Sequence, residues 1–199
     1  EHVYVTGAPF APVDLRDWIT VFERDAGTGQ ITLVESLIED GTDSQGNPIE
    51  GLAEPAWITV SPDGQHVYTA AESDDAVAVF ARDEDTGVLT FVEAVDEDGT
   101  DGQGNVINGL VSPQSVTISP DGRHLATGAD DGNVRIWDAG TGAQLLSLEG
   151  HSGLIWDVAF DPAGARLLSV CEGGTLNIWN VARLIEVMPP ARLPISFSE

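Results

Sequence analysis

Hydrophobic and polar residues alternate in short runs along most of this chain, with the two-residue period of a half-buried β-strand. One stretch holds four such runs in succession, at residues 57–61, 67–70, 76–80 and 88–95. Turn residues separate the runs, as in Pro62-Asp63-Gly64, where proline presets φ and glycine allows a positive φ. The pattern therefore predicts units of four short antiparallel strands. Residues 181–187 are ambiguous, and we interpret them as an outer strand.

The unit recurs along the chain. The segment that begins at Asp40 returns 58 residues later from Asp98, and a shorter third copy lies at 158–164, with a truncated fourth at 195–198. Four-stranded units with a period of about 40 to 60 residues are typical of β-propeller blades, because a blade needs a neighbour on each side to bury both faces. We therefore predict an all-β fold, a β-propeller of about four blades.

The repeat also predicts the blade boundaries. The four blades span 1–53, 54–112, 113–152 and 153–192, and 193–199 form the first strand of the next or closing blade. Blade 1 lacks its first strand, and the chain opens on what should be a second strand. Four blades are few, so the chain is either part of a seven- or eight-blade ring or half of a ring that a homodimer completes. We favour the first alternative.

The blades are of two kinds. Residues 19–25 with Gly27-Thr28-Gly29, and their copies at 77–87, resemble the blades of bacterial lactonase-like and YVTN-repeat propellers. Residues 119–138, Gly150-His151 and Ile178-Trp179-Asn180 resemble WD repeats. The resemblance implies a scaffold for protein–protein interaction in the second half. For the first half it implies a lactonase-type hydrolase of sugar lactones, or a degenerate relative of one.

WD repeats hold their strands together by a buried hydrogen-bond chain from a Trp indole through a Ser or Thr hydroxyl and a His to an Asp. The resemblance assigns to this chain, which we call a staple, the residues Thr127, Asp131 and Trp137 in blade 3 and His151, Ser169 and Trp179 in blade 4. Blade 3 lacks the Gly-His step, and Gly173 stands where blade 4 should carry the Asp. We expect structural roles for all six residues.

Charge narrows the function classes. Thirty-three acidic residues against eight basic ones give a net charge of −25, which excludes nucleic-acid binding by a basic face and disfavours anionic membranes. No apolar stretch is long enough to span a bilayer. Three interpretations of the charge stay open: solubility in a saline or extracellular setting, a cation-binding surface, or a protein partner with a basic patch. A bacterial or archaeal protein, cytoplasmic or extracytoplasmic, fits each of them.

Two acidic insertions, at 39–50 and 96–108, are candidates for a metal site. Carboxylates and amides in a glycine-rich loop suit Ca²⁺, although the spacing differs from an EF-hand and a solvated Asx-turn loop is the alternative. The candidate ligands are Asp40, Asp43, Asn47, Asp96, Asp98, Asp101 and Asn105.

The sequence contains no nucleophile elbow, phosphate-binding glycine loop or Cys/His cluster with ligand spacing. Our leading hypothesis is therefore a non-catalytic propeller scaffold that binds another protein, with Trp156 and Asp157 as a possible interaction surface. The alternatives are the lactonase-type hydrolase and a calcium-stabilised extracellular propeller module. The single cysteine, Cys171, is expected to be a buried structural residue.

Overall fold

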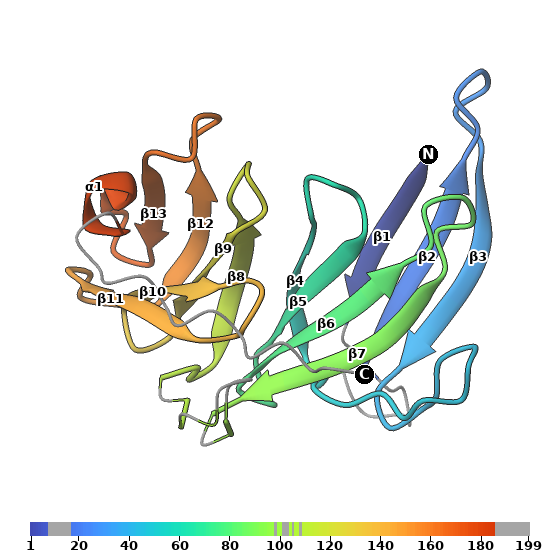
Figure 1. Ribbon diagram of the computed structural model, residues 1–199, viewed down its shortest axis with the longest axis horizontal. Helices are drawn as coiled ribbons and strands as arrows, with labels where there is room; N and C mark the ends of the chain where they lie inside the picture. Colours follow the sequence, from blue (N-terminus) through green and yellow to red (C-terminus); the bar gives the residue numbers. More distant parts are fainter. Residues whose placement is uncertain (8–16, 98, 101–103, 105, 108, 186–199) are drawn as a thin grey trace, which may run out of the picture.

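The computed structural model describes residues 1–7, 17–97, 99–100, 104, 106–107 and 109–185. Four antiparallel sheets, blades 1 to 4, follow one another along the chain (Figure 1). Blade 1 contains β1 (His2–Gly7), β2 (Trp18–Arg24) and β3 (Ile31–Ile38). Blade 2 contains β4 (Pro55–Val60), β5 (His66–Ala71), β6 (Ala76–Arg82) and β7 (Leu89–Asp96). Blade 3 contains β8 (Pro113–Ile118), β9 (His124–Ala129), β10 (Asn133–Asp138) and β11 (Gln144–Glu149). Blade 4 contains β12 (Ile155–Phe160), β13 (Leu167–Cys171) and β14 (Leu176–Trp179).

Within each blade the strands pair in chain order, as an antiparallel meander. The first strands of blades 2, 3 and 4 contact one another, with β8 between β4 and β12. This arrangement confirms the predicted all-β propeller class. The outer strand expected at residues 181–187 is wrong, because Val181–Ile185 form the short helix α1. The side-chain oxygen of Asn180 accepts a hydrogen bond from the Arg183 backbone N–H at 3.4 Å and caps this helix.

The outer hairpins share one local design. In each, an aspartate oxygen accepts the backbone N–H and the hydroxyl of a threonine three residues later, and a glycine with positive φ follows. The three copies are Asp25-Thr28-Gly29, Asp83-Thr86-Gly87 and Asp138-Thr141-Gly142. These Asx turns explain why the same few polar residues recur between strands.

The core is divided among three seams, each between neighbouring blades. Ile19 and Val21 of blade 1 pack with Val67 and Phe80 of blade 2. The second seam joins blades 2 and 3, and the third joins blades 3 and 4. The apolar residues of a blade are therefore shared between its two faces, and each face depends on the neighbouring blade for burial.

Candidate functional site

Blade 4 contains a serine–histidine pair that resembles a catalytic dyad in distance but not in setting. His151 Nε2 lies 2.6 Å from Ser169 Oγ, and the same oxygen accepts the Trp179 indole N–H at 2.8 Å. Ser169 is 2% exposed, so no substrate carbonyl can reach its hydroxyl. Burial lowers the pKa of His151 and favours the neutral imidazole. The three predicted residues are thus brought together as a strand staple.

The blade 4 staple is incomplete. His151 Nδ1 is buried and has no hydrogen-bond partner within the part of the chain that is described. The position that should supply a carboxylate is occupied by Gly173, whose counterpart in blade 3 is Asp131. A Cβ atom at Gly173 would lie 3.8 Å from Cys171 Sγ, an ordinary contact.

Replacing Gly173 with aspartate is therefore expected to stabilise the protein. The new carboxylate should accept the His151 Nδ1–H, and loss of glycine's backbone freedom should add to the effect, for a total of about 1 to 2 kcal/mol in urea unfolding. Gly173→Ala is the matched control, because it changes the backbone without adding an acceptor. The expectation fails if the aspartate variant is no more stable than the alanine variant.

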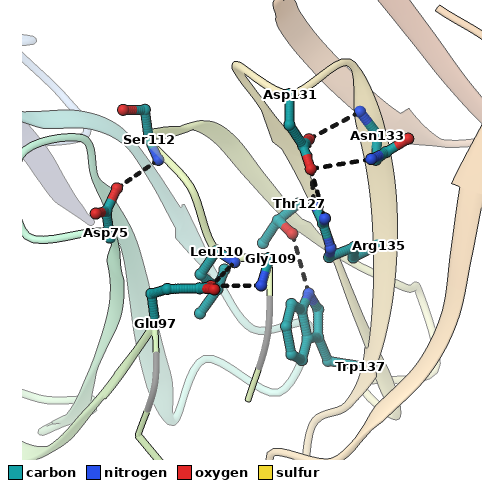
Figure 2. A network of polar contacts seen from close by, with 10 residues as sticks. All are labelled: Asp75, Glu97, Gly109, Leu110, Ser112, Thr127, Asp131, Asn133, Arg135 and Trp137. Carbon is teal, nitrogen blue, oxygen red and sulfur yellow. Dashed lines mark hydrogen bonds and ion pairs between the residues drawn. The ribbon is translucent and has the colours of Figure 1, made fainter.

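In blade 3 the predicted set divides in two. The Trp137 indole N–H donates to Thr127 Oγ1 at 3.0 Å, as expected. Asp131 does not join them; it forms an ion pair with Arg135, with Nη2 2.5 Å from Oδ2 (Figure 2). The Arg135 side chain is 8% exposed, and a Cβ at Gly109 would lie only 2.1 Å from its Nη2. Arg135 therefore fills the space beside the Gly109 loop of blade 3. This loop is the counterpart of the blade 4 loop that carries the staple histidine, His151.

Carboxylates that sequence reasoning missed hold the loops that enter blades 2 and 3. Glu97 accepts the backbone N–H groups of Gly109 and Leu110, and Asp75 accepts that of Ser112 at 2.6 Å (Figure 2). In the preceding copy, Glu39 accepts the Leu52 N–H at 2.7 Å and Asp74 the Ala53 N–H at 2.8 Å. The recurrence of Glu39 as Glu97, and of Leu52 as Leu110, is the sequence signal for this design.

Asp43, a candidate calcium ligand, is 5% exposed and already fully hydrogen-bonded. Its Oδ1 accepts the backbone N–H groups of Gln45 and Asn47, both at 2.9 Å. Its Oδ2 accepts the Asn47 side-chain amide at 2.8 Å and the Phe91 N–H of blade 2 at 2.9 Å. Four donors occupy the four acceptor sites of a carboxylate, so Asp43 serves as a loop cap and as a bond between blades.

The remaining candidate ligands are not assembled into a site by the described residues. Asp40 has a positive φ of 58° in a turn, and Asp96 ends β7. Asp98, Asp101 and Asn105 lie outside the described residues. Where the structure is described, it contains no group of three or more His, Cys, Asp or Glu suited to a metal ion. Calcium binding stays a prediction, and a calcium titration of the melting temperature tests it.

Two hollows among the described residues, each at a blade junction, also differ from a hydrolase site. The cavity between blades 2 and 3 has a volume of about 50 Å³ and is mainly apolar, with Tyr68, Val95 and Trp137 in its lining. The hollow at the junction of blades 1 and 2 has a volume of about 240 Å³ and is lined by four carboxylates. These are Glu39, Glu50, Asp74 and Asp96.

Glu39 should make stability depend on pH. Burial, followed by the nearby charges of Asp74, Asp40 and Asp17, raises the pKa of Glu39 from 4.5 to about 7. The folded state then binds the proton more tightly than the unfolded state, so the free energy of unfolding should fall as pH rises from about 4.5 to about 7. Glu39→Gln keeps an acceptor for Leu52 and removes the charge.

We therefore expect Glu39→Gln to be more stable than the parent at pH 8 and equal to it at pH 4, as measured by urea unfolding. Glu97→Gln makes the same change in the repeat copy, at a residue that does not line the acidic hollow, and controls for the general effect of removing one negative charge. An equal stability difference at both pH values would contradict the expectation.

Trp156 and Asp157 lie where β12 begins. The register between β12 and β13 shifts between Ile155 and Asp157, and the intervening Trp156 is 52% exposed. Ser115 Oγ of blade 3 donates to Asp157 Oδ1 at 3.0 Å, so Asp157 links two blades. Of the predicted surface pair, Trp156 is thus open to solvent and Asp157 is engaged in the structure.

Two protein-family models match the chain. The family model described as "Lactonase, 7-bladed beta-propeller" matches residues 13–143, about two thirds of the chain. The chain belongs to this lactonase propeller family. A second model, "WD domain, G-beta repeat", matches residues 142–180 of the lactonase-family chain. Both halves of the predicted resemblance are therefore confirmed.

Curated relatives of the lactonase-family chain match short segments of it. A U3 snoRNP-associated protein-like protein of Arabidopsis thaliana is 39% identical over 33% of this chain and 14% of its own length. The nuclear distribution protein PAC1 of Tuber melanosporum is 39% identical over 39% of the chain and 16% of its own. Coronin-7 of Mus musculus is 42% identical over 28% of this chain and 6% of its own length. The chain thus spans less than a fifth of each of these relatives.

Solved structures show the same architecture. The WD40 repeats of RRP9 superpose with a TM-score of 0.55 at 21% identity, covering 66% of this chain and 36% of that one. The structure of U3-55K gives 0.56 at 22% identity, with 66% and 37% covered. At this identity the lactonase-family chain shares the propeller fold with them. No helix in the described part is long and apolar enough to cross a membrane.

Proposed function

We propose that this chain is a non-catalytic propeller scaffold that binds a protein partner where its innermost strands begin. The observation that carries the proposal is the half-exposed indole of Trp156. Its two neighbours are fixed, because Ile155 is fully buried and Asp157 is hydrogen-bonded to blade 3. Tryptophan is enriched among the hot-spot residues near the centre of protein interfaces, since its side chain buries a large apolar area and offers one N–H donor.

The charge of the chain supports a partner with a basic patch. The net charge is −25, and such a field steers positively charged proteins toward the surface while it repels nucleic acid. Segments of the chain resemble segments of a nuclear distribution protein, a coronin and a snoRNP-associated protein. Resemblance to these varied proteins favours a binding module over an enzyme with one substrate.

The test is capture of partners from a lysate of the source cells on the immobilised chain. Trp156→Ala is expected to lower recovery of the partner at least tenfold. Gln114→Ala is the matched control, because Gln114 holds the same position at the start of β8 in blade 3. Equal recovery by the parent and the Trp156 variant would overturn the assignment of the binding surface.

The family match over residues 13–143 makes a lactonase-type hydrolase the second candidate function. Burial of Ser169 and the small volume of the apolar cavity argue against it. We expect sugar lactones to be hydrolysed no faster with the protein than in buffer, as followed by proton release. Hydrolysis that depends on the folded protein would support the enzyme and contradict the scaffold.

A further inference from the structure

The cavity between blades 2 and 3 is lined by a buried tyrosine whose hydroxyl has no partner in the described chain. Tyr68 of β5 is 5% exposed and lines this cavity. Its phenol oxygen makes no hydrogen bond with any residue that the structure describes. The other tyrosine, Tyr4, donates to the Gly87 carbonyl oxygen at 3.1 Å and accepts an N–H of Arg82 at 2.5 Å. Because buried tyrosine hydroxyls usually have such partners, Tyr68 marks a point where a bound molecule can form a hydrogen bond.

A second hydroxyl on the same cavity has a proton that it does not share. Thr127 of β9 is 1% exposed and lines the cavity, and its Oγ1 accepts the Trp137 indole N–H at 3.0 Å (Figure 2). The Thr127 O–H itself donates to no described residue. In blade 4 the matching hydroxyl, of Ser169, lies 2.6 Å from Nε2 of the staple histidine His151. Without that histidine, blade 3 keeps a second O–H donor at the cavity wall.

The rest of the lining limits the size and charge of a ligand. Val77, Val95 and Leu125 contribute to a mainly apolar wall, and the volume is about 50 Å³. A water molecule needs about 10 to 15 Å³, so this space accommodates about four non-hydrogen atoms. Glu93 also lines the cavity and is exposed, so its carboxylate lies on the solvent side and disfavours an anionic ligand.

We propose that this cavity binds a neutral acetamido group, CH3–CO–NH, carried by a small molecule or a side chain. The carbonyl oxygen has two lone pairs and accepts the O–H groups of Tyr68 and Thr127. The methyl group contacts the apolar wall, and the amide N–H donates to Glu93. The four non-hydrogen atoms of the group match the volume, and the remainder of the ligand stays in solvent. The inference is independent of the partner surface at Trp156.

Titration with N-methylacetamide tests the proposal directly. The indole N–H signal of Trp137 in the NMR spectrum of the isotope-labelled chain should shift and saturate, with a Kd of about 1 to 10 mM for so small a ligand. Trp137→Phe identifies this signal among those of the five tryptophans. Acetate has a similar shape but a negative charge, and it should bind at least tenfold more weakly. Absence of a saturable shift up to about 100 mM N-methylacetamide would overturn the proposal.

Tyr68→Phe removes the hydroxyl and keeps the ring. This variant should bind N-methylacetamide at least fivefold more weakly and unfold at the same urea concentration as the parent, because the hydroxyl has no partner to lose. Tyr4→Phe is the matched control: it should keep the affinity of the parent and be less stable, since it loses the bonds to Gly87 and Arg82. Equal affinity of the Tyr68 variant and the parent would overturn the proposal.

Glu93→Gln tests the open side of the cavity. Glutamine keeps an oxygen acceptor for the amide N–H and removes the negative charge, so N-methylacetamide should bind as before and acetate should bind more tightly than to the parent. Unchanged exclusion of acetate would overturn the position assigned to Glu93 beside the ligand.

Two larger probes distinguish the sources of the group. N-acetylglucosamine carries it on a sugar and Nε-acetyl-lysine on a protein side chain, and the one that displaces N-methylacetamide at the lower concentration identifies the source. Glucosamine and lysine lack the acetyl group and carry a positive charge, which the acidic chain attracts. They should not displace N-methylacetamide. Displacement by these amines at the same concentration as by the acetylated probes would overturn the proposal.

Discussion

Replacement of Asp43 by alanine is expected to lower the free energy of unfolding by about 3 to 4 kcal/mol. The carboxylate is buried and accepts four N–H donors, one of them from Phe91 in the neighbouring blade. Alanine would leave these donors unpaired and would remove a bond between blades 1 and 2. Urea unfolding followed by circular dichroism measures the loss.

Asp25→Ala is the matched control for this prediction. Asp25 also caps a turn, but on an exposed hairpin and with donors from its own turn alone, so the expected loss is small. Equal losses for the two variants would contradict the role assigned to Asp43 between the blades.

The hydrogen bonds to Asp43 should also make the free energy of unfolding depend on pH in the acid range. Burial alone would raise the pKa of Asp43, but hydrogen bonds from Asn47, Phe91 and Gln45 outweigh it and hold that pKa below its usual value of 3.8. The stability that the folded state gains from the ionised form is present above about pH 4 and is lost as pH falls through the lowered pKa. Asp43→Asn should remove this part of the acid dependence.

Trp137→Ala is expected to cost about 4 kcal/mol, the usual loss for a large buried aromatic side chain. Trp137 is 4% exposed in the seam between blades 2 and 3, and its indole N–H reaches Thr127. Trp156→Ala is the control within the same protein, and because its side chain is half exposed we expect a loss below about 0.5 kcal/mol.

A double-mutant cycle separates the hydrogen bond from the packing. Trp137→Phe and Thr127→Val each remove one partner of the bond, and the pair should show a coupling energy of about 1 kcal/mol. Additive effects would mean that the indole stabilises the seam by volume alone.

The fold could be predicted because the repeat fixes both the strands and their turns. Copies such as Asp25-Thr28-Gly29 and Asp83-Thr86-Gly87 mark the same hairpin each time. After Trp179 the chain does not repeat this hairpin sequence. Asn180 caps a short helix there, and the alternation of apolar and polar residues over so few positions could not distinguish this helix from a strand.

The site was less accessible to sequence reasoning, because the partner of a charged residue is set by the loop that faces it. The sequence assigns Asp131 to a staple that already lacks its histidine, and only the structure shows that Arg135 takes the carboxylate instead. Asp43 carries the composition of a calcium ligand, and only the three-dimensional structure shows that N–H donors occupy both of its oxygens.

The WD sequence repeat and the four-stranded sheet of a blade are offset from each other by one strand. The WD match begins at residue 142, so it takes in β11, the outer strand of blade 3, before it reaches β12 to β14 of blade 4. If the chain were cut before residue 142, the part that keeps blade 3 would lose β11, and β10 would become an unpaired edge strand. Exposed strand edges of this kind promote aggregation. A version shortened at residue 150 keeps the blade 3 sheet whole. Trimming and fusion of this protein should therefore follow its sheets and not its repeats.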